Sequence, residues 1–220
     1  IVFFFFISST YKDITKQTEP MERTPEKEIR VGNEILRIFA EENPESPRTW
    51  GNLGTMICFH KRYSLGDKHD YKANDYDSIS ELKAAIIKKE KPAIILPLYL
   101  YDHSGITMKT TSFNDRWDSG QVGFIIISKE KIRKEYNVKR INKKLIQDVT
   151  ERLIGEVETY DQYLRGDVYM FEVVKVETCD KGCEHEEHED SCGGFFGTDF
   201  KTNGITDHLS KELAEALIAA

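Results

Sequence analysis

The longest regular apolar pattern in the chain lies between residues 141 and 164, and it dictates a layered fold. The pattern has apolar residues at every third or fourth position: Ile141, Leu145, Ile146, Val149, Leu153, Ile154, Val157 and Tyr160. This spacing predicts an amphipathic helix, which the Arg165–Gly166 pair would end. Because such a helix is apolar along only one stripe, the chain must supply an apolar layer that covers it.

Apolar segments of strand length supply that layer. The expected strands are residues 55–60, 93–101, 121–128, 167–177 and 193–197. Gly32–Asn33 predicts a further hairpin turn, with a helix over residues 34–42 as the alternative. Pro97 lies in the middle of its strand, so it implies a sheet edge or a bulge there.

We therefore expect an α+β fold with a mixed or antiparallel sheet of about five strands. Two or three helices would pack on one face of the sheet, including one that Asp77–Ser78 caps and one over residues 205–219. Residues 21–220 would form a single domain, with a Cys/His-rich hairpin loop at residues 178–192. Met21 opens a segment that resembles an ordinary start, so residues 1–20 are expected outside the natural domain, or as an added strand.

Composition limits the class of protein. The chain of 220 residues is 39% hydrophobic and 31% charged, which predicts a soluble globular protein. Its net charge of −7 argues against a protein that coats DNA generally. The apolar run Ile1–Ile7 is too short to cross a bilayer, so no membrane association is expected. The usual glycine-rich nucleotide-binding loops do not occur in the sequence.

Three of the four cysteines fall within fourteen residues, together with two histidines. The run T-C-D-K-G-C-E-H-E-E-H-E-D-S-C contains Cys179, Cys183, His185, His188 and Cys192. Thiolate and imidazole are the ligands that zinc prefers, and any four of these five could complete a tetrahedral structural site. The alternative is a solvated acidic loop with incidental cysteines. The fourth cysteine, Cys58, lies in an apolar segment and is expected to be buried.

A second group of polar residues follows or precedes predicted strands. His60 comes after one strand, Asp102 and His103 follow another, and Trp117–Asp118 precedes a third. If these strand ends converge, the aspartates could orient the histidines in a general-base or metal site. Turn chemistry explains the same residues, because Asp and Ser are common after strands. Together with exposed aromatic anchors such as Trp50, this group is the predicted binding site.

Charge is distributed unevenly along the chain. Residues 129–144 contain eight basic and two acidic side chains, whereas residues 177–199 contain eight acidic side chains and Lys181. The basic segment could contact nucleic acid, although a solvated connection between elements explains it as well. A dipolar surface also suits docking with another protein or self-association into a homo-oligomer.

Several segments resemble a family of uncharacterised accessory proteins encoded by tailed bacteriophages and gut metagenomes. They are S-P-R-T-W-G-N-L-G-T-M-I-C-F-H, L-Y-L-Y-D-H-S-G-I-T-M, R-W-D-S-G-Q-V-G and D-S-C-G-G-F-F-G. The resemblance covers most of residues 35–197 and implies phage origin rather than a particular chemistry. Cys192 belongs to the shared pattern, whereas Cys179, Cys183, His185 and His188 look like an addition in this chain.

The function that these observations favour is binding. We expect a phage accessory protein, in the cytoplasm of the infected bacterium, that binds a host or phage protein complex. Inhibition of a host defence system such as a CRISPR effector is the leading hypothesis. One alternative is a metal-dependent enzyme with His60, Asp102, His103 and Asp118 at its site. The other is nucleic-acid binding through residues 129–144. No catalytic signature is recognised, which favours a protein that is not an enzyme.

Overall fold

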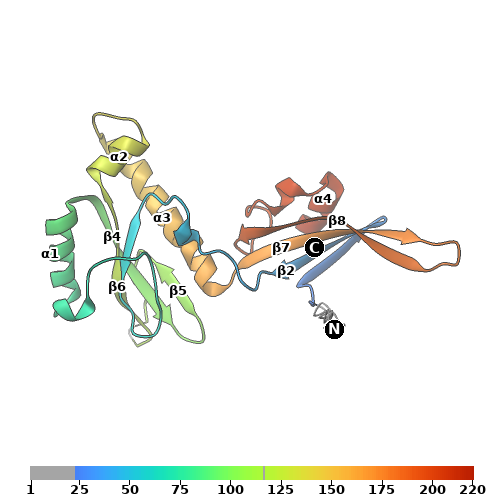
Figure 1. Ribbon diagram of the computed structural model, residues 1–220, viewed down its shortest axis with the longest axis horizontal. Coiled ribbons are helices and arrows are strands. Elements are labelled where there is room, and N and C mark those ends of the chain that lie inside the picture. Colours follow the sequence, from blue (N-terminus) through green and yellow to red (C-terminus); the bar gives the residue numbers. More distant parts are fainter. Residues whose placement is uncertain (1–22, 116) are drawn as a thin grey trace, which may run out of the picture.

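Two antiparallel sheets, each of four strands, organise the computed structural model, which describes residues 23–115 and 117–220. The first sheet has the order β1-β2-β7-β8, with bounds Lys27–Val31, Glu34–Ala40, Val168–Thr178 and Glu184–Phe196. The second has the order β3-β6-β4-β5, with bounds Thr55–Cys58, Ser119–Ser128, Pro92–Asp102 and Ile106–Lys109. The two sheets lie side by side along the long axis of the molecule (Figure 1).

The helices begin and end at residues that suit their positions. They are α1 (Ile79–Glu90), α2 (Lys129–Glu135), α3 (Lys143–Arg165) and α4 (Lys211–Ala219). Short 3-10 helices occupy Pro47–Thr49, Ala73–Asp75 and Ile205–His208. Ser78 caps α1, and Asn142 caps α3 by accepting a hydrogen bond from the Leu145 backbone. Gly166 ends α3 with a φ of 79°, a conformation that glycine adopts without strain.

The second sheet is buried on both faces. Ile125 and Ile127 of β6 pack with Leu153 and the other buried residues of α3. Phe124 and Ile126 face the other way and pack with α1. Figure 1 shows α1 and α3 on opposite sides of these strands. The continuous apolar run of β6 is therefore explained by a helix on each face.

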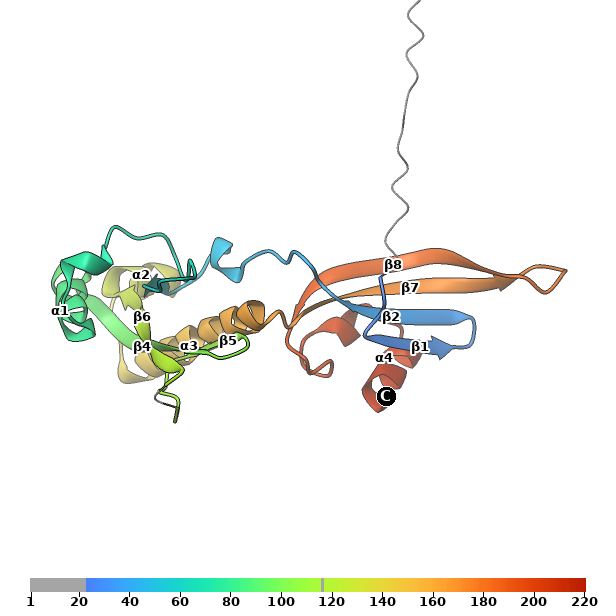
Figure 2. The ribbon, with the colours of Figure 1, turned by 90° about the horizontal axis from the view of Figure 1, so that it is seen from below.

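The first sheet has its main core on one face, and a small buried cluster of Ile35, Val174 and Val176 on the other. Leu36, Ile38 and Phe171 are fully buried in the main core, and Leu213 and Leu217 of α4 cover them. The β7–β8 hairpin extends beyond the β1–β2 hairpin and ends in a free tip (Figures 1 and 2). We call residues 177–185, the part of the hairpin that lies beyond its pairing with β2, the arm.

The α+β class and the antiparallel pairing predicted from the sequence are confirmed. The strands form two sheets rather than one sheet of about five. The proline-rich segment after β2 separates that strand from β3, and β2 pairs instead with β7, from Glu34↔Lys175 to Ala40↔Tyr169. Helices also cover both faces of the second sheet instead of one. The hairpin at Gly32–Asn33 is confirmed, with β1 and β2 as its strands.

Pro97 lies where the prediction placed it, at an irregular position. The pairing of β4 with β5 begins only at Tyr99, and the register with β6 shifts between Leu98 and Tyr99. Pro97 therefore has no neighbour from β5, so its missing N–H costs no ladder hydrogen bond on that side.

The strand pairing and the helix positions do not test the two predictions about the boundaries of the domain. That residues 21–220 form a single domain stays a prediction, and residues 1–20 lie outside the described residues. In the part of the chain that is described, none of the helices combines the length and the hydrophobicity that crossing a bilayer requires.

Candidate functional site

Three strands of the second sheet bring their polar flanking residues to the same end of the sheet. The register pairs Tyr101 with Ser119 and Cys58 with Gly123, so β4 ends opposite the first residue of β6, and β3 ends four residues further along β6. The Asp102 backbone N–H donates to the Asp118 carbonyl at 2.8 Å. Five residues lie at this end of the sheet: His60, Asp102, His103, Trp117 and Asp118. We call them the strand-end cluster. The predicted convergence of strand ends is therefore present.

Asp102 is the centre of one half of the cluster. Its carboxylate accepts hydrogen bonds from the Arg62 guanidinium and, at 3.4 Å, from the Tyr63 hydroxyl. His60 Nε2 lies 3.8 Å from the same carboxylate. The His60 and Tyr63 rings are stacked, with centroids 4.9 Å apart. Arg62 is a site residue that the sequence did not indicate, because nothing in the sequence places its loop against the end of β4; Tyr63 was expected only as one of several loop aromatics that could serve as binding anchors.

His103 and Asp118 form the other half of the cluster. His103 Nδ1 lies 2.9 Å from the Asp118 carboxylate, and both side chains are partly exposed. Since Nδ1 is engaged, Nε2, which has no hydrogen-bond partner among the described residues, is the ring nitrogen that can take a ligand or a proton. An aspartate that orients a histidine in this way is the arrangement that general-base chemistry uses.

Trp117 is exposed to solvent just before β6, where two backbone hydrogen bonds restrain the chain. The Asp115 carboxylate accepts hydrogen bonds from the backbone N–H groups of Trp117 and Asp118, at 2.7 and 2.9 Å. These two donors lower the pKa of Asp115 below its ordinary value, the Asp118 N–H having the larger effect. The Trp117 side chain is 95% exposed. The backbone N–H groups of Trp117 and Asp118 are thus held by hydrogen bonds, while no described residue covers the indole ring with apolar surface.

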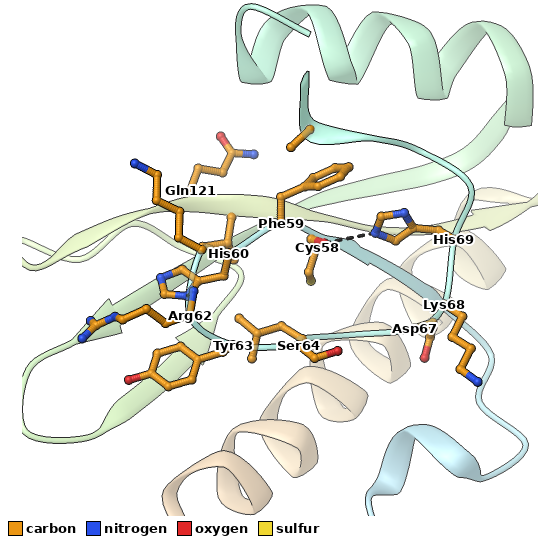
Figure 3. A pocket seen from close by; sticks show the side chains of 14 residues that line it. Cys58, Phe59, His60, Arg62, Tyr63, Ser64, Asp67, Lys68, His69 and Gln121 are labelled. Carbon is orange, nitrogen blue, oxygen red and sulfur yellow. Dashed lines mark hydrogen bonds between the residues drawn. The ribbon is translucent and has the colours of Figure 1, made fainter. Parts of the chain in front are cut away.

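Two cavities adjoin the cluster. The smaller, of about 310 Å³, is lined by Asp102, Trp117 and Asp118 among others. The larger, of about 890 Å³, lies between the loop of residues 59–69 and β6. His60 and Arg62 line both cavities. Figure 3 shows the larger one, with His60, Arg62 and Tyr63 on one side and His69, which is hydrogen-bonded to the Cys58 carbonyl, on the other.

A buried ion network fixes the wall of the larger cavity. The Arg48 guanidinium donates to both oxygens of Asp67, at 2.9 and 2.6 Å, and to Glu156 of α3 at 3.4 Å. Glu156 also accepts from the backbone N–H groups of Leu53 and Gly54. Burial opposes the charged form of Arg48, but the hydrogen bonds and charges of Asp67 and Glu156 outweigh it and raise its pKa. This network also was missed, since Arg48 lies in a segment that the sequence marks only as a loop.

Trp50 does not join the strand-end cluster. Its ring packs edge-on against Phe196 of the first sheet, with centroids 5.3 Å apart, and it remains 46% exposed. It lines neither cavity. Five of the six predicted binding residues therefore lie at one end of the second sheet. Trp50 lies elsewhere because its loop runs toward the first sheet.

The Cys/His run lies mostly on a strand and not in a loop. His185, His188 and Cys192 belong to β8, while Cys179 and Cys183 close the turn at the tip of the arm. His185 pairs with Glu177 and His188 with Val174, so alternation places the two histidines on opposite faces of the sheet.

The same strand separates the cysteines of the run. At roughly 3.3 Å per residue, Cys183 and Cys192 are about 30 Å apart along β8. Within residues 23–115 and 117–220, no three His, Cys, Asp or Glu side chains are arranged to hold a metal ion. Structural zinc bound by four of these five residues stays a prediction, and it would require other side-chain positions than these.

The cysteines differ in their surroundings. Backbone N–H groups of Lys181 and Cys183 lower the pKa of the Cys179 thiol. Burial, assisted by the negative charge of Asp67, raises the pKa of Cys58 to about 12. The prediction that Cys58 is buried is confirmed.

Comparisons of this chain with family models, with curated proteins and with solved structures find no match.

Proposed function

We propose that the protein acts by binding another protein and that the strand-end cluster is its docking surface. The observation that carries this proposal is the exposure of Trp117, whose backbone N–H is hydrogen-bonded to the Asp115 carboxylate. Tryptophan is enriched among the residues that dominate protein–protein binding energy. The hydrogen bonds of the Trp117 and Asp118 N–H groups to Asp115 restrain the backbone beside the ring, which lowers the entropic cost of association.

The surroundings of Trp117 suit a docking surface. A cavity of about 310 Å³ adjoins the ring and is lined by Asp102, by its partner Arg62 and by Asp118, which pairs with His103. An apolar anchor bordered by charged and hydrogen-bonding groups is the usual anatomy of a binding hot spot and its rim.

The resemblance to phage accessory proteins directs the choice of partner. A phage protein that acts by binding has its partners in the infected cell, and a complex of host or phage proteins is the expected target. We propose a host defence system, such as a CRISPR effector, because inhibiting it by binding needs no catalytic site.

Plaque assays test this proposal. The protein is expressed in bacteria that carry a CRISPR effector or another defence system, and in bacteria without one, and a targeted phage is plated on each. We expect the wild-type protein to restore plating on a defended host. Loss of a hot-spot tryptophan costs about 2 kcal/mol or more of binding energy, roughly a thirtyfold loss of affinity. Trp117→Ala should therefore abolish most of the protection.

Ile87→Ala is the matched control. Ile87 is another exposed apolar side chain, 46% exposed on the outer side of α1, and it has no part in the cluster. This variant should protect as well as the wild type. Thermal unfolding should be the same for all three proteins, because neither side chain belongs to a core. Absence of protection against every defence system in the panel would contradict the choice of partner, and equal protection by Trp117→Ala would contradict the choice of surface.

General acid–base catalysis is the second candidate function, because the two His–Asp pairs lie together at one end of the second sheet. His103 with Asp118 supplies a histidine whose Nε2 is free, which is the element that such chemistry needs. The metal-dependent form of this hypothesis lacks support from the side-chain positions in the described residues. In addition, Asp102 is engaged by Arg62, which favours a structural role for this carboxylate.

Nucleic-acid binding by residues 129–144 stays a prediction. The segment forms α2 and the start of α3, and most of its basic side chains are exposed. Lys131 instead donates to the Asn52 carbonyl at 2.9 Å, which is a contact within the protein. A mobility-shift assay at several salt concentrations would test it, since phosphate contacts must weaken as salt rises.

A further inference from the structure

The tip of the arm places two thiols directly across a tight turn. The β7–β8 register runs to Thr178↔Glu184, and the next pair in that register is Cys179 and Cys183. The Cys179 backbone N–H donates to the Cys183 carbonyl at 2.9 Å. The Gly182 N–H donates to the Cys179 carbonyl at 2.8 Å, and Gly182 has a φ of 79°. This is a three-residue hairpin loop closed by a left-handed glycine.

The geometry of this turn suits a disulfide. Residues opposite each other in antiparallel strands have Cα atoms about 4.5–5.5 Å apart, and disulfides join Cα atoms about 4.4–6.8 Å apart. The two side chains also belong to one face of the hairpin, because Cβ atoms of a cross-strand pair point the same way. The Cys183 backbone N–H already lies 3.3 Å from the Cys179 sulfur.

Both thiols are accessible to solvent, and no other cysteine is close enough to form a disulfide with either of them. Cys183 is exposed and Cys179 partly exposed. Cys192 is about 30 Å away along β8, and Cys58 is buried in the core of the second sheet. The family resemblance covers neither of the two tip cysteines, so the pair does not follow from it.

We propose that Cys179 and Cys183 form a thiol–disulfide exchange site whose substrates are small disulfides of the glutathione type. Cys179 is the attacking residue, since its sulfur receives the Cys183 N–H, a donor that stabilises a thiolate. Cys183 is the resolving residue, held opposite it by the turn.

The exchange proceeds in two balanced steps. The Cys179 thiolate attacks one sulfur of the small disulfide, so a mixed disulfide forms and one small thiolate leaves and takes a proton from water. The Cys183 thiolate then attacks the Cys179 sulfur, which forms the Cys179–Cys183 bond and releases the second small thiol. The two protein thiols lose two electrons and two protons in total, and one small disulfide becomes two thiols.

Peptide mapping after equilibration in glutathione buffers tests the site. The full chain is reduced, transferred without oxygen to buffers of increasing oxidised-to-reduced glutathione ratio, quenched with acid and alkylated. Lys181 lies between the two cysteines, so trypsin separates residues 176–181 from residues 182–201. We expect these two peptides to become linked as the ratio rises, with a loss of two hydrogen atoms from the intact mass.

Single substitutions identify the cysteines involved. Cys192→Ser is the matched control, since it removes the other cysteine of the second peptide and should leave the linkage unchanged. Cys183→Ser should stop the reaction at the mixed disulfide on Cys179, and Cys179→Ser should abolish the linkage. These side chains lie at the tip, so the variants should fold, and a circular dichroism spectrum checks this.

Three outcomes would contradict the proposal. One is complete alkylation of both thiols at the most oxidising ratio. Another is loss of the linkage in Cys192→Ser, which would show pairing between Cys179 and Cys192. The third is one zinc ion per chain that must be removed before any disulfide forms, because the tip would then be a metal site. Metal content of the same sample, by mass spectrometry, decides this last point.

Discussion

At the scale of the residue, Arg48 shows how a charge can stabilise a loop from inside. Its side chain is 5% exposed and joins Asp67, the Gly54 carbonyl and Glu156 of α3. Asp67 in turn accepts a hydrogen bond from the Met56 N–H of β3 at 2.8 Å. The loops before and after β3 are thus tied to α3 by one guanidinium. The wall of the larger cavity depends on this arrangement.

We predict a large loss of stability on removing the charge. Arg48→Met keeps much of the volume but leaves Asp67 and Glu156 facing each other without a cation. Breaking a buried ion pair in this way costs about 3–5 kcal/mol. Urea unfolding followed by circular dichroism measures the change.

Arg30→Met is the control for Arg48→Met, because Arg30 pairs with Glu184 on the exposed arm. Exposed pairs contribute about 0–1 kcal/mol to stability, so its urea midpoint should move far less than that of Arg48→Met. Equal midpoints for the Arg48 and Arg30 variants would contradict the structural role given to Arg48.

At the scale of the element, the contact between β3 and β6 depends on a glycine. A Cβ added at Gly123 would lie 1.9 Å from the Ile57 carbonyl oxygen, which belongs to the backbone and cannot move aside. Gly123→Ala must therefore separate the two strands and disturb the end of the sheet where the strand-end cluster lies. We expect a loss of stability at or above the usual 1–3 kcal/mol of overpacking.

Gly120 on the same strand is the matched control. Nothing lies within 4 Å of a Cβ added there, and its φ is not in the left-handed region. Gly120→Ala should therefore leave the melting temperature nearly unchanged. If Gly123→Ala melts at the same temperature as Gly120→Ala, the strand pairing described here is incorrect.

Ion pairs cover the open face of the first sheet and predict how its stability depends on pH. The Arg37 hydrogen bond lowers the pKa of Glu186, and the Arg30 hydrogen bond lowers that of Glu184. A folded-state pKa below the ordinary value of 4.5 means that the carboxylate stabilises the fold at pH above 4.5. This stabilisation is lost as the pH falls through the lowered folded-state pKa.

We therefore expect acid to destabilise the wild type more than a variant without these arginines. The urea midpoint should fall from about pH 6 to about pH 3 in the wild type, and by less in the Arg30→Met, Arg37→Met double variant. An equal fall in both proteins would mean that these pairs contribute nothing to the acid sensitivity.

At the scale of the whole molecule, local patterns predicted most elements but not their assembly. The helical stripe became α3, and the apolar runs became β3, β4, β6 and β7, because periodicity and length are local signals. The division into two sheets was not predictable, since it depends on the pairing of β2 with β7, more than a hundred residues apart along the chain. No sequence pattern specifies such a distant partner.

The candidate site was predictable to a similar degree. Asp and His residues at strand ends indicated a site at one end of a sheet, and the antiparallel register brings them together there. Arg62 was missed, and Tyr63 was expected only as one of several loop aromatics, because the loop after β3 folds back by tertiary contacts alone. The density of the Cys/His run predicted a single loop, but β8 extends through most of it and spreads its members along a strand.

Binding through the strand-end cluster is the central claim, and plating efficiency of a targeted phage on a defended host tests it most directly. The wild-type protein and Ile87→Ala should restore plating, whereas Trp117→Ala, folded and equally expressed, should not. Equal restoration by Trp117→Ala and the wild type would contradict this claim.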